Sequence, residues 1–216
     1  GLTETSPILT ILPMAEHEQA IAGENVALLQ SVGRPIPGVE MRIVDDNDTD
    51  VPIDAAGEII VRGANVSTGY FNRPDETRTG FRKGWLHTGD VGRMNDQGYL
   101  FLLDRKKDMI ITGGENVYSA EVENAIYQNT AVNQCAVIGI PHEKWGEQVH
   151  AVVVLHEGQS VDEAELIEHC KQLIAGFKCP RSVSFQSESL PLSGAGKILK
   201  TELRKPYWKG VERSVN

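Results

Sequence analysis

The hydrophobic pattern changes character near the middle of the chain. In the first half, short apolar runs such as 39–44 and 57–62 are separated by segments rich in Asp, Asn and Gly, a pattern typical of β-strands joined by tight turns. The segment 95–98 predicts a hairpin turn between strands at 91–94 and 99–103. We therefore expect a small antiparallel, barrel-like unit in this half.

The exception in the first half is the polar stretch 5–32. It contains one short apolar run, 9–12, and too few periodic apolar positions to predict an amphipathic helix. We interpret this stretch as a loop that leaves and rejoins the β-rich unit.

The second half alternates helical and strand patterns. The expected helices are 120–128, a helix between a capping box at 160–163 and Gly176, and 199–204, and the expected strands are 133–140, 148–155 and 183–185. Cys170 falls on the apolar stripe of the middle helix, which favours a buried structural thiol over a nucleophile. The predicted fold class is α+β, with a β-rich unit followed by a small sheet flanked by helices.

Five consecutive charged residues, 104–108, separate the two halves. On composition alone this run is a solvated linker. Because it lies between two apolar segments, it also marks a boundary, and we expect domains at 1–103 and 109–216.

Composition narrows the classes of function. The chain has 216 residues, 40% of them hydrophobic, and a formal net charge of −9, which argues against non-specific binding to nucleic acid or to an anionic membrane. Its apolar runs are too short to predict a transmembrane segment. Three cysteines without metal-ligand spacing favour a reducing, cytoplasmic compartment, so the expected partners are small molecules or proteins.

Five short motifs carry the candidate chemistry. They are Gly1-Leu2-Thr3-Glu4, the segment 57–63 with Gly69-Tyr70, the segment 85–90, the segment 104–123, and Ser193-Gly194-Ala195-Gly196-Lys197. In this order they resemble the motifs of the adenylate-forming acyl-CoA synthetases, a superfamily shared with peptide-synthetase adenylation domains and luciferases. Each motif alone is weak, whereas five in order are specific. Because the first motif begins at residue 1, we expect the chain to be the C-terminal part of a longer enzyme.

The resemblance implies a nucleotide site in the first domain. It matches Thr3 to phosphate, Glu4 to a Mg²⁺ ion that bridges ATP phosphates, Asp90 to the ribose hydroxyls, and Arg105 to ribose or phosphate. Chemically, a carboxylate can hold Mg²⁺ or accept two hydroxyls. Without the resemblance, Glu4 is a surface glutamate and Asp90 a turn aspartate.

The resemblance also implies that the second domain is a mobile lid. It matches Asp104 to the hinge and Lys197 to the ammonium that stabilises charge on the α-phosphate during adenylation. Gly113 and Gly114 either form a plain turn or leave room for the pantetheine arm of CoA, and the resemblance favours the second interpretation, with Gly114 closer to the tunnel.

The function implied for the parent enzyme is an acid–thiol ligase that uses ATP, Mg²⁺ and CoA to convert a carboxylic acid, of fatty-acid type, into its acyl-CoA. The glycine-rich phosphate loop and the acyl pocket lie outside these residues, so we expect the chain alone to be inactive. The alternatives are an adenylating enzyme with an acceptor other than CoA, and a stand-alone binding module.

Overall fold

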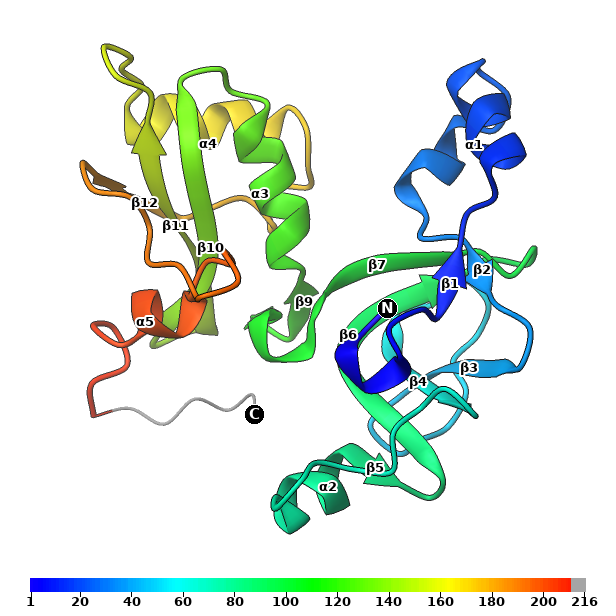
Figure 1. The fold of residues 1–216 in the computed structure, drawn as a ribbon. Helices are drawn as coiled ribbons and strands as arrows, with labels where there is room; N and C mark the ends of the chain where they lie inside the picture. The colour runs from blue at the N-terminus through cyan, green and yellow to red at the C-terminus, as the bar shows by residue number, and fades with distance from the viewer. Residues whose placement is uncertain (211–216) are drawn as a thin grey trace. The chain divides into compact units, whose positions relative to one another are not determined.

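The computed structural model describes residues 1–210 (Figure 1). The chain divides into two compact units, one spanning Gly1–Lys106 and one that begins at Lys107. Both combine helices with small, largely antiparallel sheets, which confirms the predicted α+β class.

Unit 1 is built on a five-stranded antiparallel sheet. Its strands are β3 (Val39–Val44), β4 (Gly57–Gly63), β5 (Phe81–Arg82), β6 (Trp85–Met94) and β7 (Leu100–Arg105), and a separate pair is formed by β1 (Thr10–Ile11) and β2 (Arg34–Pro35). The long β6 pairs with β4, β5 and β7, so it is the central strand. Side chains alternate between the two faces of the sheet along each strand. On the core face, Ile59 and Val61 of β4 pack with Leu86 of β6.

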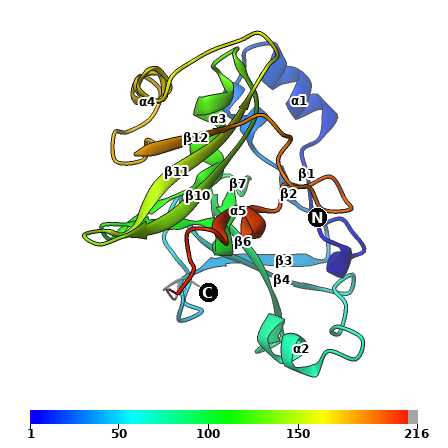
Figure 2. The ribbon, with the colours of Figure 1, turned by 90° about the vertical axis from the view of Figure 1, so that its left-hand side faces the viewer.

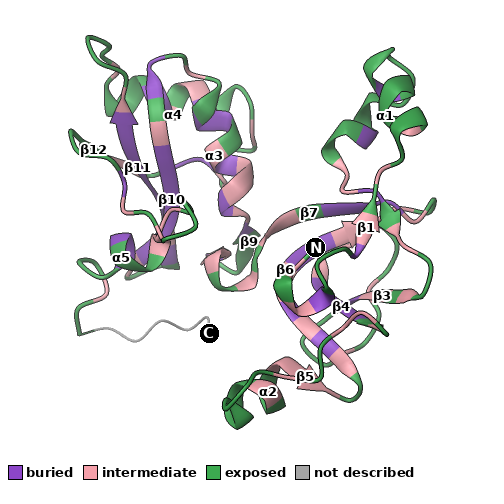
Figure 3. Cartoon of the chain, viewed as in Figure 1, coloured by how far each residue is buried: buried purple, intermediate pink, exposed green. Residues whose placement is uncertain are grey.

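The stretch expected to be a loop is partly helical, so that prediction was wrong. It contains α1 (Met14–Ile21) and the 3₁₀ helix η2 (Val26–Gln30). Pro13 stands at the N-cap of α1, and only Ala20 on this helix is buried, in a cluster with Tyr99 and Phe101 of the β6–β7 hairpin. A single buried position gives no helical periodicity in the sequence. The helix is therefore stabilised by tertiary packing and is not predicted by the local pattern. Figure 3 shows α1 as mostly exposed.

The remaining elements of unit 1 are short. They are the 3₁₀ helices η1 (Thr3–Thr5) and η3 (Lys106–Asp108), the latter spanning the boundary, and the helix α2 (Pro74–Gly80).

Unit 2 is a mixed sheet covered on both faces. Its elements are β8 (Ile110–Thr112), β9 (Glu115–Val117), α3 (Ser119–Tyr127), β10 (Val132–His142), β11 (Gly146–Leu155), α4 (Glu163–Lys171), β12 (Ser182–Gln186) and α5 (Lys200–Arg204). β11 pairs antiparallel with β10 and with β8, and β8 pairs antiparallel with β9. β12 lies parallel beside β11 (Figure 2).

Alternate residues of β10 and β11 face two separate cores. One core contains Val137 and Val153 with Val122 of α3 and Leu166 of α4. The other contains Ile138 with Leu203 of α5 and Leu190 from the segment before it. Because both faces are covered, the two strands are buried along most of their length.

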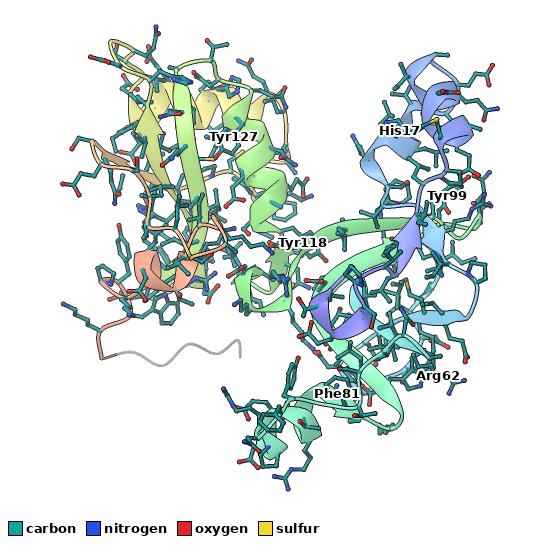
Figure 4. All side chains as sticks on the ribbon, in the orientation of Figure 1. His17, Arg62, Phe81, Tyr99, Tyr118 and Tyr127 are labelled. Atoms are coloured by element: carbon teal, nitrogen blue, oxygen red, sulfur yellow. The ribbon has the colours of Figure 1, made fainter. Side chains whose placement is uncertain are left out.

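The outer edge of β10 is closed by side chains of α3. The Tyr127 hydroxyl accepts a hydrogen bond from the Cys135 N–H at 3.0 Å, and Glu123 accepts one from Val137 N–H at 2.8 Å (Figure 4 labels Tyr127). These bonds satisfy donors that would otherwise invite pairing with another strand.

The three cysteines are free and buried. Cys170 lies on the buried face of α4 and is fully buried, as its place on the apolar stripe predicts. Burial raises the pKa of Cys170 to about 11 and that of Cys135 to about 12, so neither is a ready nucleophile. Within residues 1–210, no helix is long and apolar enough to cross a membrane.

The helix α4 begins two residues later than its sequence signature predicts. Its N-cap is Asp162, whose Oδ1 accepts from Glu165 N–H at 2.8 Å, while Glu165 Oε2 accepts from Asp162 N–H at 3.1 Å. The capping box is therefore 162–165 and not 160–163. A carboxylate satisfies the helix N–H groups and also favours the positive end of the helix dipole.

We therefore expect Asp162→Ala to lower the free energy of unfolding of unit 2 by about 1 kcal/mol, because the cap is lost. Ser160→Ala, at the cap that the sequence predicts, is the matched control, with an expected change within about 0.5 kcal/mol. Urea unfolding followed by hydrogen exchange of α4 amides measures both. Equal losses in the two variants would contradict the observed cap.

Candidate functional site

Asp90 and Arg105, the two predicted ribose contacts, lie beside each other on neighbouring strands. They are partners in the β6–β7 register, and Arg105 Nε is 2.8 Å from Asp90 Oδ1. The Asp90 side chain is 19% exposed and that of Arg105 is 46% exposed, so the pair is open to a ligand. A carboxylate held in this way can accept hydrogen bonds from two hydroxyls, and the guanidinium can contact phosphate or hydroxyl oxygens.

The backbone that presents Asp90 is irregular. The register of β6 shifts both against β4 and against β7, and Gly89 has φ of +69°, a conformation that favours glycine. The Thr88 hydroxyl accepts from Asp90 N–H at 3.1 Å and donates to the Ile59 carbonyl at 2.7 Å. Bulges of this kind redirect side chains out of a regular ladder.

Asp90 also lines a small pocket of about 70 Å³. The other lining residues are Gly1, Leu2, Leu9, Thr10, Val32, Met41, Ile59, Thr88, Leu100 and Leu102. The pocket brings the segment before Thr3 next to Asp90.

Thr3 and Glu4 form the 3₁₀ helix η1. Thr3 is exposed, and the half-buried Glu4 accepts a hydrogen bond from the Tyr70 hydroxyl at 2.9 Å. Burial, followed by the bond to Glu4, raises the pKa of Tyr70. The motif analysis included Tyr70 without giving it a role, so the structure identifies it as the residue that orients Glu4.

The chemistry of Glu4 fits a magnesium ligand. Mg²⁺ bound to a nucleotide takes one or two protein carboxylates in addition to phosphate oxygens. Among the residues that the structure describes, no group of three or more metal-ligating side chains occurs.

Glu58 is a site residue that the sequence reasoning missed. It is 9% exposed at the start of β4. Its carboxylate accepts from Gly89 N–H at 3.3 Å and from Lys106 Nζ at 3.1 Å. Glu58 thus joins the turn before Asp90 to the last residue of unit 1. The available signal was a carboxylate at the head of an apolar run, where a charge needs partners.

The predicted hinge segment lies across the boundary between the units. Asp104 lies in β7, two residues before the boundary, and its Oδ1 accepts from Arg105 N–H at 2.8 Å. Lys106 is 2.8 Å from Asp46 as well as bonded to Glu58. On the other side, Asp108 forms an ion pair of 2.7 Å with Arg204 of α5.

Gly113 and Gly114 form the two-residue turn of the β8–β9 hairpin. Thr112 pairs with Glu115, and the glycines have φ of +61° and +89°. Two positive φ values in a two-residue hairpin are the requirement of a type I′ turn. A Cβ at Gly114 would meet nothing within 4 Å, so this turn is exposed and open to a ligand.

An aromatic side chain lies against this turn and was also missed. The Trp145 carbonyl accepts from Gly113 N–H at 3.0 Å. The indole ring stacks on His142, with centroids 4.1 Å apart, and Arg181 lies 3.7 Å from its centroid. A cation over an indole is an attractive contact, and it places a positive charge near the glycine turn.

Lys197 is exposed at the end of a closed turn. Ser193 N–H donates to the Lys197 carbonyl at 2.7 Å, and Lys197 N–H donates to the Ser193 hydroxyl at 3.1 Å. These bonds order the backbone of the turn. The long, flexible side chain of Lys197 can still carry its ammonium group away from this ordered backbone.

Several basic residues in the last forty of the chain form ion pairs. Lys178 pairs with Glu121, Lys200 with Glu123, Arg204 with Asp108, and Lys205 with Glu202. Only Lys205 and its partner are both largely exposed.

Comparison with known families finds a match in each of the two units. Residues 1–71 match the family described as AMP-binding enzyme, and residues 121–197 match the AMP-binding enzyme C-terminal domain. The chain belongs to the AMP-binding enzyme family. The matched segments include Thr3, Glu4 and Lys197.

Relatives and solved structures extend the similarity across the boundary. The chain is 42% identical over 207 residues to a feruloyl-CoA synthase of Amycolatopsis sp, covering 96% of this chain and 40% of the relative. It is 39% identical to the fatty acid–[acyl-carrier-protein] ligase ScoC of Streptomyces coeruleorubidus, covering 100% and 40%.

Among solved structures, o-succinylbenzoate CoA synthetase of Bacillus subtilis, in complex with its acyl-adenylate intermediate, matches with a TM-score of 0.84 and 36% identity, covering 94% of this chain and 40% of that one. The chain thus spans about 40% of the length of these matched proteins.

His87 lies between Asp48 and Glu58 and provides a test of the buried network of unit 1. Its side chain is 5% exposed, with Nδ1 3.5 Å from Glu58 and Nε2 3.7 Å from Asp48. Burial, and then the charge of Arg82, lowers the pKa of His87 below the usual 6.5. The unfolded chain therefore binds the proton more readily, and stability falls as the pH drops below about 6.5.

We expect His87→Gln to reduce the loss of unit 1 stability between pH 7 and pH 5. Hydrogen exchange of β4 and β6 amides at a series of pH values measures this loss. His17→Gln, at an exposed position on α1 (Figure 4), is the control. An unchanged pH dependence in the His87 variant would show that His87 does not titrate in this way.

Proposed function

We propose that these residues belong to an ATP-dependent ligase that activates a carboxylic acid as its acyl-adenylate and passes the acyl group to the thiol of CoA. In the first step a carboxylate oxygen bonds to the α-phosphorus and pyrophosphate leaves. In the second, the thiolate attacks the acyl carbon and AMP leaves. The observation that carries this proposal is the Asp90–Arg105 pair, presented at 2.8 Å in a chain that also bears the Glu4 and Lys197 motifs.

In the first step, Asp90 would accept the ribose hydroxyls and Arg105 would contact ribose or phosphate oxygen. The exposed Lys197 would bring its ammonium to the α-phosphate, where negative charge increases in the transition state. Thr3 would donate its hydroxyl to a phosphate oxygen. Glu4 would hold Mg²⁺, which supplies charge neutralisation to the phosphates when bound, and Tyr70 would keep the Glu4 carboxylate oriented.

In the second step, the exposed turn at Gly113 and Gly114 would line the path of the pantetheine arm. The absence of side chains there leaves room for a thin, extended group. Arg181, above the ring of Trp145, lies close enough to this turn to attract a phosphate of CoA.

Alternation between the steps requires a pivot within 104–108. The sequence resemblance points to Asp104, but Asp104 lies in β7 and is paired with Val91 of β6. Lys106 is anchored in unit 1 by Glu58, and Asp108 is anchored in unit 2 by Arg204. These contacts favour a pivot at Lys107, because a hinge needs only a few backbone angles that can change.

The acid and the acceptor are part of the proposal. We infer an organic acid of the fatty or aromatic class, since the relatives include a fatty-acid ligase and a feruloyl-CoA synthase. The ligase named for acyl-carrier protein supports an alternative thiol acceptor. Three free thiols support a reducing, cytoplasmic location.

The test uses a full-length enzyme that contains these residues and a panel of acids. Acyl-hydroxamate formed with ATP, Mg²⁺ and hydroxylamine reports the first step, and a supplied acyl-adenylate with CoA reports the second. We expect Lys197→Ala to slow the first step by about 100- to 1,000-fold and to leave the second largely intact.

Two controls define the outcome of that test. The 216-residue chain alone should form no hydroxamate, and if it did, the activating groups would all lie within these residues. Equal loss of both steps in Lys197→Ala would reject a role confined to adenylation.

Gly114→Val should show the opposite pattern. The new side chain would obstruct the pantetheine path and slow thioester formation by about tenfold or more, while adenylation is spared. Gly158→Val is the matched control, because Gly158 also has positive φ and open surroundings in unit 2 and shares the backbone strain. Similar losses in both variants would assign the effect to strain and remove the tunnel role.

A further inference from the structure

The turn that carries Lys197 has little freedom relative to the helix that follows it. Leu192 and Ile198 form a β-bridge, and Leu199 N–H donates to the Pro191 carbonyl at 2.8 Å. Ile198 packs on the second core of unit 2 while its neighbour Lys197 is exposed. The Lys197 backbone is therefore tied to the residues that lead directly into α5.

The helix α5 cannot hold itself in place. It has five residues, too few for a helix that is stable without tertiary contacts. Its one buried apolar side chain is Leu203, which packs on the second core. After the helix, the Tyr207 hydroxyl lies 3.0 Å from His150 Nε2, and Trp208 Nε1 donates to the Gly139 carbonyl at 3.0 Å. Within the helix itself, polar contacts must add to the single apolar contact to define its orientation.

Two buried cations on one face of α5 provide those contacts. Lys200 and Arg204 are four residues apart, and their side chains are only 14% and 8% exposed. Lys200 Nζ is 2.6 Å from Glu123 and donates to the Ser119 hydroxyl at 2.6 Å. Arg204 is 2.7 Å from Asp108.

The acceptors of these bonds are themselves fixed. Ser119 is fully buried at the start of α3, and Glu123 also accepts from Val137 N–H of β10 at 2.8 Å. Asp108 ends η3, immediately after Lys107. The contacts therefore tie α5 both to α3 and to the first residues of unit 2.

We propose that Lys200 and Arg204 are positioning residues that hold Lys197 in register with the start of unit 2, through the Lys200–Glu123 and Arg204–Asp108 ion pairs. The proposal rests on the proposed function for the role of Lys197. A turn of the backbone at Lys107 would be transmitted to α5 through Arg204, so that Lys197 moves with the unit as one body.

The same helix supplies a matched control. Lys205 pairs with Glu202 on the exposed side of α5, where the two side chains are 67% and 46% exposed. An exposed pair of this kind contributes little to structure. Lys205→Met removes a cation from α5 without touching either anchor.

The first measurement is hydrogen exchange of the 216-residue chain by mass spectrometry. We expect Lys200→Met and Arg204→Met to speed exchange in 193–199 by about tenfold, with β11 unchanged and Lys205→Met without effect. If Arg204→Met also exposes β11, Asp108→Asn gives the same test with a smaller change. Unchanged exchange in 193–199 in both anchor variants, or in Asp108→Asn, would overturn the proposal.

The second measurement is a double-mutant cycle in a full-length enzyme. Arg204→Met should slow adenylation by at least about tenfold through misplacement of Lys197, and should cost nothing further in a Lys197→Ala background. Additive losses would show that Arg204 acts independently of Lys197 and would overturn the positioning role. If Lys197→Ala alone left adenylation intact, the proposed function of Lys197 would fail, while the exchange experiment would still decide the anchoring.

Discussion

Ion pairs hold the chain on each side of the boundary between the two units. Lys106 is bound by Glu58 and Asp46 of unit 1, and Asp108 is bound by Arg204 of unit 2. Removing one partner of a buried pair leaves an uncompensated charge, which is far more costly than losing an exposed pair. These ion pairs therefore keep Lys106 in unit 1 and Asp108 in unit 2. Lys107 is the one residue between them in the sequence.

The same construction links the boundary to the candidate nucleotide site. Glu58 contacts both Lys106 and the N–H of Gly89, the residue before Asp90. Arg105, the residue before Lys106, pairs with Asp90 across β6 and β7. The residues that we propose as nucleotide contacts are thus one residue away from the segment of the proposed rotation. The Glu58 carboxylate, within an antiparallel sheet, makes this connection.

In unit 2, one polar contact joins the two segments to which we assign the separate steps. Ser119 begins α3 directly after the β8–β9 hairpin that contains Gly113 and Gly114. Lys200, which donates to Ser119, lies three residues after Lys197. This contact therefore fixes the segment of the candidate adenylation lysine relative to the segment of the candidate thiol path. Lys200 and Ser119 are 81 positions apart in the sequence.

The sequence by itself determined the elements and chemistry that local pattern encodes. Alternation of apolar residues predicted most strands of unit 1, and the stripe through Leu166 and Cys170 predicted the core helix of unit 2. The ordered motifs predicted the family, and the comparisons confirmed it. These features can be predicted from the sequence because each depends on residues close together in the chain.

The tertiary structure decided what depends on distant partners. Helix α1 forms although only Ala20 is buried, because the β6–β7 hairpin supplies the packing. Glu58, Trp145 and Arg204 look like ordinary residues in the sequence, since a charge or ring has no visible role until its partner is known. Their roles come from contacts between strands and helices far apart in the sequence, and only folding creates those contacts.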